Sequence, residues 1–209
     1  MTPNNIVNMA LLLGLDAIAV SDHNSSLNLP AVFDAAKNTD LVIIPAIEVC
    51  TNEEVHLLCL FHSLNDVMNF NETIYEFLPP IKNNENVFGK QLILDSEDNI
   101  IGKEEKLLIN ALSIGIEQLL KISKSNNGVV IPAHVDKHSY SIISNLGFIP
   151  EEYEFTCIEI KNPENKIQFN GKYITNSDAH YLENISEPIH FLEVKEKSID
   201  GIMEYFKEH

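Results

Sequence analysis

Short apolar runs alternate with segments of helical periodicity along most of the chain, and this alternation limits the possible folds more than any other feature. Residues 41–47 form a near-continuous apolar run, typical of a strand buried on both faces. Residues 64–78 show helical spacing and stop at Pro79-Pro80. Repeated strand–helix alternation predicts an α/β fold with parallel strands.

The same patterns locate the other elements. Helices are predicted over residues 2–13, 29–38, 64–78, 114–123, 140–146 and 198–206. Strands are predicted over residues 16–20, 41–47, 55–61, 128–133, 155–160, 172–175 and 189–194. Residues 81–112 break the rhythm, and an acidic turn between two short apolar runs predicts an inserted hairpin there. No repeat or linker divides the sequence, so a single domain over residues 1–209 is expected.

The chain is acidic and contains no arginine. Its 14 lysines face 31 acidic residues, which gives a formal net charge of −17. Arginine is the preferred bidentate ligand of phosphate and the commonest reader of guanine edges, so nucleic acid is predicted to be an unlikely partner. Any bound phosphate would depend on metal ions, lysine or backbone N–H groups.

The sequence also indicates a cellular environment. No apolar stretch approaches the roughly 18 residues of a transmembrane helix, and no basic segment followed by an apolar one opens the chain. Three cysteines, an odd number, fit reduced thiols better than a disulfide framework. We therefore expect a cytoplasmic protein with no membrane partner.

Histidines and carboxylates gather at the ends of predicted strands. The residues are His23, Glu48, His56, His134, Asp178 and His180. All but His56, which lies near a strand start, follow the C-terminal end of a strand. These ends form one face of a parallel barrel, and the residue types suit Zn²⁺, Mn²⁺ or Fe²⁺. The sequence predicts that they converge in one pocket, with His23 at its edge.

Most of these residues also fit a structural role. His23 could belong to a helix cap, and His56 could be a hydrogen-bonded core histidine. His134, Asp178 and His180 could be turn formers. Glu48 is more specific, because it follows seven apolar residues and a carboxylate buried there without a partner would be costly. Four further histidines lack the strand-end placement and are expected to be surface or capping residues: His62, His138, His190 and His209.

Five ordered motifs resemble those of the PHP family, the polymerase and histidinol phosphatase type of metal-dependent phosphoesterases. The motifs are Ser-Asp-His-Asn at 21–24, Pro-Ala-Ile-Glu-Val at 45–49, Glu-Val-His-Leu-Leu at 54–58, Ile-Pro-Ala-His at 131–134 and Asn-Ser-Asp-Ala-His at 176–180. The resemblance runs from residue 2 to the last predicted helix. It implies a distorted (β/α)7 barrel with up to three divalent metal ions at the strand ends.

The resemblance also implies how the metal ligands are grouped. Glu48 would bridge two metal ions, and His56 and His134 would complete the site of one of them. Asp178 would bind the bridged partner ion. The metal would be Mn²⁺, Zn²⁺ or Fe²⁺.

The remaining implied roles concern the third metal and the substrate. His23 and His180 would bind the third ion. Asp22 would orient a neighbouring ligand. Lys137 is the candidate for a phosphate contact, because no arginine is present, although a solvated loop lysine would fit the same position.

The resemblance departs from the family at its first motif. Family members begin with a strand that carries Asp-x-His-x-His, whereas residues 1–15 contain no histidine. We therefore expect an N-terminally incomplete domain without its first strand, and favour a fragment over a degenerate member. The site of Glu48, His56 and His134 keeps its ligands, so about one tightly bound metal ion per chain is expected.

These observations predict a metal-dependent phosphoesterase that hydrolyses a small phosphorylated metabolite or nucleotide, impaired by the missing first motif. One alternative is a non-catalytic PHP-like domain with a structural or partner-binding role. A second alternative is a hydrolase of the amidohydrolase type, in which a lysine usually bridges where Glu48 stands. The sequence leaves the substrate, the metal and the oligomeric state open.

Overall fold

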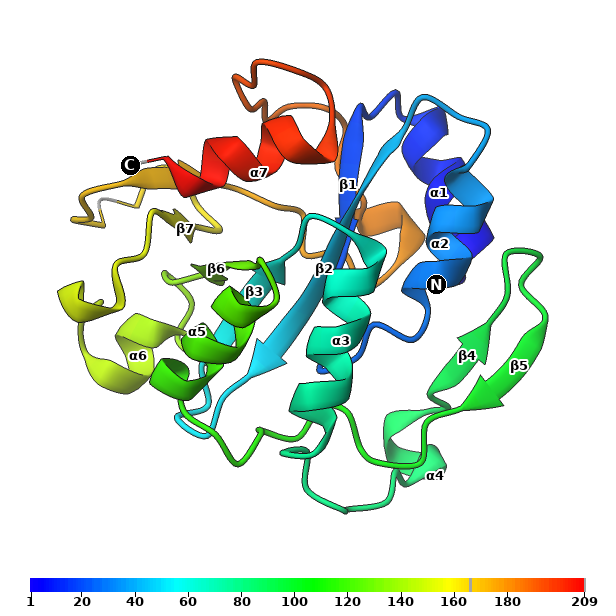
Figure 1. The fold of residues 1–209 in the computed structure, drawn as a ribbon, viewed down its shortest axis with the longest axis horizontal. Coiled ribbons are helices and arrows are strands. Elements are labelled where there is room, and N and C mark those ends of the chain that lie inside the picture. Colours follow the sequence, from blue (N-terminus) through cyan, green and yellow to red (C-terminus); the bar gives the residue numbers. More distant parts are fainter. Residues whose placement is uncertain (166, 209) are drawn as a thin grey trace.

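The computed structural model describes residues 1–165 and 167–208 and shows a mixed α/β fold (Figure 1). Its central sheet has four strands in the order β1–β2–β3–β6. These strands are β1 (Ala17–Val20), β2 (Val42–Cys50), β3 (His56–Leu60) and β6 (Val129–Pro132). Each of them coincides with a strand predicted from an apolar run, and β2 continues past that run to include Glu48.

Strand β3 runs against its neighbours. Strands β1 and β2 are parallel, but β3 pairs antiparallel with both β2 and β6. The prediction of a uniformly parallel sheet is therefore wrong. The cause is local, since only residues 51–55 separate β2 from β3, and a parallel connection needs about a dozen residues or more.

The described residues form no closed barrel. Strands β7 (Cys157–Glu159) and β8 (Lys172–Ile174) pair with each other in a separate parallel sheet. Residues 189–194, predicted as a strand, form no ladder in the described part of the chain. Leu192 and Val194 of this segment pack on the core while Phe191 is 78% exposed, so the alternation is real. An alternating pattern does not by itself supply backbone partners.

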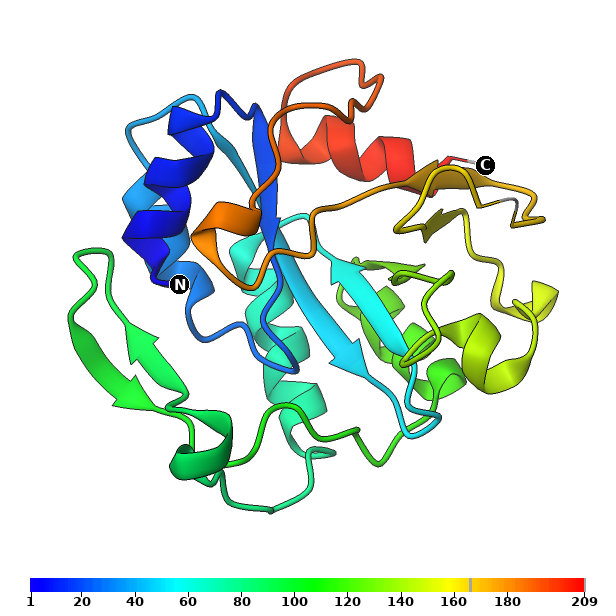
Figure 2. The ribbon, with the colours of Figure 1, turned by 180° about the vertical axis from the view of Figure 1, so that it is seen from behind.

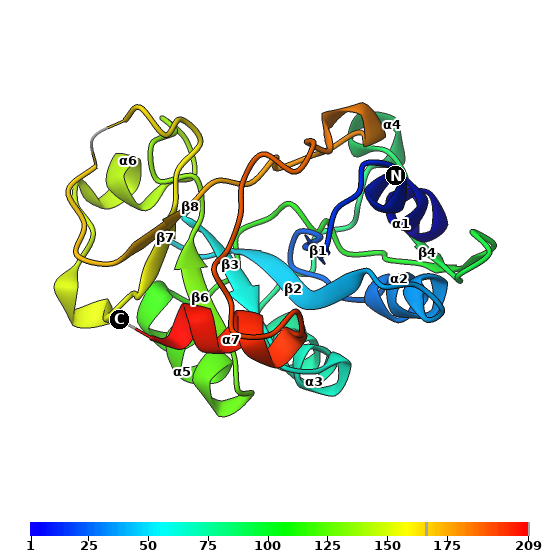
Figure 3. The same cartoon turned by 90° about the horizontal axis from the view of Figure 1, so that it is seen from above.

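Helices cover the central sheet in an arrangement that follows the alternation of its side chains. Helices α3 (Leu64–Tyr75) and α5 (Ile116–Ser125) share a core cluster with Ile47 and Val49 of β2. Helix α7 (Ile199–Lys207) packs against Ile44 and Ala46 of the same strand. In Figure 1 α7 lies at the height from which β2 starts, and the arrowhead at the C-terminal end of β2 points away from it. Figure 3 shows α7 lying across the sheet.

Two structures flank the sheet beyond β1 (Figure 2). Helices α1 (Pro3–Leu12) and α2 (Leu29–Ala36) pack together on a third apolar cluster. The insert contains α4 (Glu85–Phe88) and the predicted hairpin, β4 (Leu92–Leu94) and β5 (Ile100–Lys103). Asp98 in the hairpin turn accepts hydrogen bonds from Thr2 Oγ1 at 2.6 Å and from the Asn4 N–H at 3.0 Å. The acidic turn therefore caps the first helix.

The remaining helical elements are short. Helix α6 (Ile142–Leu146) follows β6, and two 3₁₀ turns span Glu151–Tyr153 and Leu182–Asn184. Cys50, Cys59 and Cys157 are free and buried. None of the helices in residues 1–165 and 167–208 has the length and apolar character required to cross a membrane.

Candidate metal centre

Polar side chains from several strands meet at the end of the central sheet opposite α7. Glu48 lies near the C-terminal end of β2, and His134 follows the C-terminal end of β6. His56 is the first residue of β3, where it pairs with Cys50. Because β3 is antiparallel to its neighbours, its first residue lies at the same end of the sheet as the last residues of β2 and β6. The reversed strand therefore explains how a histidine at a strand start joins the group.

These side chains surround a small cavity of about 110 Å³. It is lined by His23, Glu48, His56, His134, Lys137, Ser139, Tyr140, Asp178 and His180. The structure thus brings the six predicted metal ligands and Lys137 to one cavity. Asp22 is not among the lining residues.

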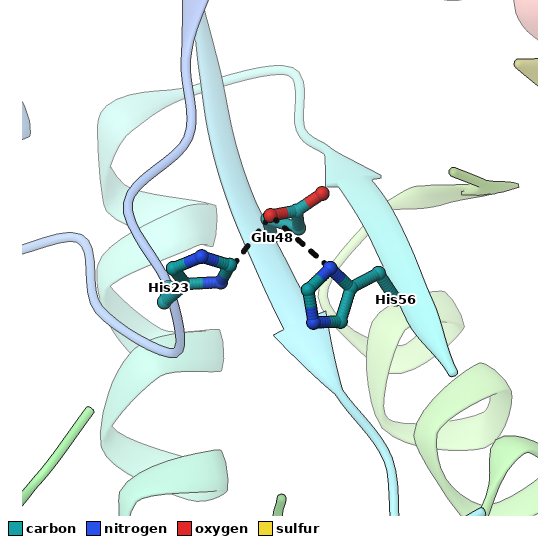
Figure 4. A group of neighbouring side chains, drawn as sticks. All are labelled: His23, Glu48 and His56. Carbon is teal, nitrogen blue, oxygen red and sulfur yellow. Dashed lines mark ion pairs between the residues drawn. The ribbon is translucent and has the colours of Figure 1, made fainter. Parts of the chain in front are cut away.

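Glu48 lies at the centre of the histidines (Figure 4). Its Oε2 atom is 3.2 Å from His23 Nδ1 and 3.6 Å from His56 Nδ1. Its Oε1 atom is 3.8 Å from His134 Nε2, which in turn lies 3.3 Å from His56 Nδ1. His23, Glu48 and His56 offer ligand atoms that all lie within 4.8 Å of one another. This spacing approaches that of ligands around a single ion, which bind at about 2.0–2.2 Å.

The structure places His23 in the cavity lining, beside Glu48 and His56. Residues 22–24 are attached to β2 by two backbone hydrogen bonds, from the Glu48 N–H to the Asp22 carbonyl at 3.2 Å and from the Asn24 N–H to the Glu48 carbonyl at 2.9 Å. The His23 ring consequently lies closer to His56 than to His180, with centroid separations of 5.1 and 6.4 Å. The resemblance instead grouped His23 with His180.

Burial controls the ionisation of this group. Burial, reinforced by His23 and His134, lowers the pKa of His56 to about 3, and burial also lowers the pKa of His134 to about 4. Burial, with repulsion from Asp178, raises the pKa of Glu48 to about 8. Neutral imidazoles beside a carboxylate form the donor set that a divalent cation binds, and the cation would stabilise the ionised carboxylate.

An unsatisfied nitrogen supports the same fit. The Nδ1 atom of His23 is buried and makes no hydrogen bond within the described residues, although Glu48 Oε2 lies 3.2 Å away. Buried polar atoms without partners are uncommon and costly. A cation bound to both atoms would satisfy them, so the residues present fit a metal ion.

Asp178 lies in the same cavity beside two lysines. Lys137 Nζ donates a hydrogen bond to Asp178 Oδ2 at 2.7 Å, and Lys161 Nζ lies 3.9 Å from the same oxygen. Burial opposes ionisation of Asp178, but the Lys137 hydrogen bond and the two positive charges outweigh it and lower the pKa of Asp178. His180 is the most open member of the group, with a side chain 64% exposed.

Four of the eight non-glycine residues with positive φ in the described part of the chain lie in or beside the cavity. Asn24, His134, Tyr140 and Asp178 all have positive φ angles, of 49°, 32°, 53° and 51°. Non-glycine residues seldom adopt this conformation, at a cost of about 1–3 kcal/mol each, and they persist where the surrounding structure fixes them. Such residues concentrate at functional sites.

Asp22 contacts the site through its backbone only. Its side chain is exposed and accepts a long hydrogen bond from Asn28 Nδ2 at 3.4 Å. Within the described residues no hydrogen bond or ion pair joins its carboxylate to a predicted ligand. The orienting role of this carboxylate stays a prediction.

Glu159, at the end of β7, was missed by the sequence analysis. It is 4% exposed, and burial, with repulsion from Asp178, raises its pKa to about 7. Its charge also contributes to the raised pKa of Glu48. The signal was a carboxylate inside the apolar run Cys-Ile-Glu-Ile, the same kind of signal that singled out Glu48.

The histidines predicted to lie outside the site are absent from the cavity lining. His62 contacts Asp200 and Lys207 near α7, and His138 and His190 are exposed. His209 lies outside the described residues.

Comparison with known proteins finds solved structures of similar fold. Neither a family model nor a curated protein matches the sequence. The lesion-specific endonuclease PfuEndoQ from Pyrococcus furiosus is similar in structure, with 19% identity, a TM-score of 0.65, and coverage of 99% of this chain and 51% of that chain. Endonuclease Q in complex with a 27-mer duplex gives 18% identity, a TM-score of 0.65, and coverage of 99% and 52%. The chain thus spans about half the length of these proteins.

This likeness establishes the fold. Endonuclease Q is a member of the PHP family, so the PHP-like character recognised from the five motifs is confirmed at the level of fold. The α/β class is confirmed too, while a complete (β/α)7 barrel is not seen in the described residues.

One prediction has to be corrected. Endonuclease Q was solved with an abasic lesion of a DNA duplex at its active site. The prediction that nucleic acid is an unlikely partner is therefore wrong. It relied on net charge and on the absence of arginine, but local cations, including bound metal ions, can attract phosphate to an acidic protein.

Proposed function

We propose that this chain is a metal-dependent hydrolase of the PHP type that acts on phosphoesters, with residues 1–209 forming one PHP-like domain. The observation that carries the proposal is the arrangement of His23, His56 and His134 around the buried carboxylate of Glu48. A buried acid among neutral imidazoles is unfavourable without a cation, and it is the donor set of metal hydrolases.

The cavity residues would have two roles, metal binding and phosphate binding. His23, Glu48, His56 and His134 would hold a first ion, and Asp178 and His180 a further one, chosen from Mn²⁺, Zn²⁺ and Fe²⁺. When bound, such an ion lowers the pKa of a coordinated water and neutralises charge on the phosphoryl oxygens. Lys137, which lines the cavity and donates a hydrogen bond from Nζ to Asp178, would bind a phosphoryl oxygen.

The substrate class that we propose is a nucleotide or a nucleic-acid phosphodiester. The fold shared with an endonuclease supports this choice. Lys137 lines the cavity and Lys161 lies behind it, with their Nζ atoms 2.7 and 3.9 Å from Asp178 Oδ2, and both supply positive charge near the place where a phosphate would bind. In a chain with a net charge of −17, such local cations decide where an anion binds.

The test is hydrolysis by the purified chain after removal of metal with a chelator and addition of Mn²⁺, Zn²⁺ or Fe²⁺. We expect metal-dependent cleavage of thymidine 5′-phosphate 4-nitrophenyl ester, and its loss in Glu48→Gln. Lys207→Ala, at the opposite end of the sheet, is the matched control and should keep wild-type activity. Metal binding without cleavage would favour a non-catalytic domain, and the absence of both would contradict the proposal.

A further inference from the structure

Tyr140 lies at the cavity, where it covers a predicted metal ligand and is also exposed to solvent. It belongs to the cavity lining and is 43% exposed. Its ring stacks on the His56 imidazole, with ring centroids 4.7 Å apart and an interplanar angle of 22°. The tyrosine thus covers a predicted metal ligand and still presents much of its surface to solvent beside the cavity.

The backbone holds Tyr140 in this position. Its φ angle of 53° is rare for an aromatic residue. Its carbonyl accepts a hydrogen bond from the His56 N–H at 2.9 Å. The next residue, Ser141, caps α6 and donates a hydrogen bond from Oγ to the Lys137 carbonyl at 2.7 Å. Tyr140 is therefore held by a hydrogen bond to strand β3 and by helix α6, which begins directly after it in the sequence.

The same short segment supplies the cavity with a cation. Lys137 and Tyr140 lie three residues apart between β6 and α6, and both line the cavity. A phosphate bound at Lys137 would bring the group attached to it toward the tyrosine. A fixed, half-open aromatic ring beside a phosphate site is suited to stacking on a planar group, because every nucleic-acid base has a π-face.

We propose that Tyr140 is the platform on which the base of the substrate stacks while the adjacent phosphoryl group occupies the cavity, an inference that rests on the proposed phosphoesterase function. The ligand chemistry is a base ring next to a phosphate, supplied either by a free nucleotide or by a nucleic-acid strand. A tyrosine that served only to pack on His56 would not need to leave much of its surface in solvent.

Equilibrium binding to the full chain tests this proposal. Adenosine 5′-monophosphate and ribose 5-phosphate are compared by calorimetry, with and without Mn²⁺. We expect the wild-type chain to bind the nucleotide more tightly. Tyr140→Leu should weaken nucleotide binding by about 5- to 150-fold, the range for loss of one base–aromatic stack, and leave ribose 5-phosphate unchanged. Tyr140→Phe should retain nucleotide affinity.

Controls separate stacking from packing. Leucine keeps an apolar side chain over His56, and Phe191→Ala removes an exposed aromatic residue outside the cavity, so it should have no effect. The metal content of Tyr140→Leu should equal that of the wild-type chain. Loss of metal, equal weakening of both ligands, or equal affinity of the wild-type chain for both ligands would overturn the proposal.

The two sources of the base are distinguished with a 5′-phosphorylated adenine oligonucleotide. Tighter binding than the mononucleotide points to a strand and equal binding to a free nucleotide, and Tyr140→Leu should weaken either. Failure here is distinct from failure of the proposed function. A chain that cleaves phosphoesters but does not discriminate a base would overturn the platform alone. A chain that binds nucleotide through Tyr140 but does not cleave would contradict the hydrolase alone.

Discussion

Strand β3 has a histidine at or just beyond each end, and the two differ in their surroundings. His56 at its start is 8% exposed and faces Glu48 and another histidine. His62, just past its end, has a side chain 26% exposed and lies 3.0 Å from an Asp200 carboxylate that is itself 80% exposed. Both ends combine histidine, carboxylate and lysine. Desolvation and the convergence of several imidazoles, rather than residue type, therefore distinguish the candidate metal centre.

The architecture explains the contrast. At one end of the sheet, Ile202, Met203 and Phe206 of α7 pack in an apolar cluster with residues of the strands. At the other end lies a cavity lined by histidines, carboxylates and a lysine. The candidate metal centre therefore lies at the end of the sheet where buried polar side chains take the place of the apolar core.

The largest expected effect follows removal of the central carboxylate charge. Glu48→Gln keeps the shape of the side chain but should lower Mn²⁺ or Zn²⁺ affinity more than 100-fold. Replacing a residue that only hydrogen-bonds to a metal ligand already lowers affinity about 10–100-fold. Asp200→Asn, at the other end of β3, should leave affinity unchanged. Calorimetric titration of both variants measures the two affinities. An equal loss of affinity in both variants would contradict the distinction between the two ends of β3.

The second effect concerns the cavity cation. Lys137→Met should raise KM for a phosphodiester about 10- to 100-fold, in line with the loss of one charged hydrogen bond. Lys161→Met should have a smaller effect, because Lys161 lies further from Asp178. Steady-state kinetics would contradict this assignment if Lys161→Met had the larger effect.

The metal-free chain should lose stability at mildly alkaline pH. The pKa of Glu48 rises from 4.5 unfolded to about 8 folded, so between these values the folded chain holds a proton that the unfolded chain has released, and stability falls as pH rises. His56 and His134 act in the opposite sense below pH 6.5, because only the unfolded imidazoles bind protons there.

Above pH 6.5 the carboxylate effect therefore remains, and the free energy of unfolding should fall by about 1–2 kcal/mol between pH 6.5 and 8. Denaturant titrations at several pH values in a chelator measure this slope. Glu48→Gln should reduce the slope and leave the smaller fall that Glu159, with a pKa raised to about 7, also causes. An unchanged slope in that variant would assign the effect to other groups.

The smallest effect is expected at the other end of β3. His62→Ala removes contacts with Asp200 and Lys207 that are largely open to solvent. Such surface pairs contribute about 0.2–1 kcal/mol. The free energy of unfolding, measured by thermal unfolding, should fall by no more than that. A larger loss would show that His62 contributes more to stability than its solvent-exposed contacts explain.

Most helices and strands could be predicted from the sequence because each of them shows its own hydrophobic periodicity. Glu48 could be found because a carboxylate at the end of an apolar run is conspicuous, and Glu159 could have been found in the same way. The direction of β3 was also accessible, since residues 51–55 are too few for a parallel connection.

Other features depend on long-range contacts. The pairing of His23 with Glu48 arises from a bridge between residues far apart in sequence. The alternation in residues 189–194 does not reveal whether a neighbouring strand is present. The position of Tyr140 depends on a backbone conformation that favours glycine and on a hydrogen bond to β3, neither of which periodicity encodes.

Anomalous diffraction at the manganese edge, from crystals soaked in Mn²⁺, would locate the metal ion itself. We expect an anomalous peak bounded by His23, Glu48 and His56, where three ligand atoms already lie within 4.8 Å of one another. The same experiment on Glu48→Gln should show no peak there. A peak only at His62 and Asp200, or none in crystals of the wild-type chain, would contradict this expectation.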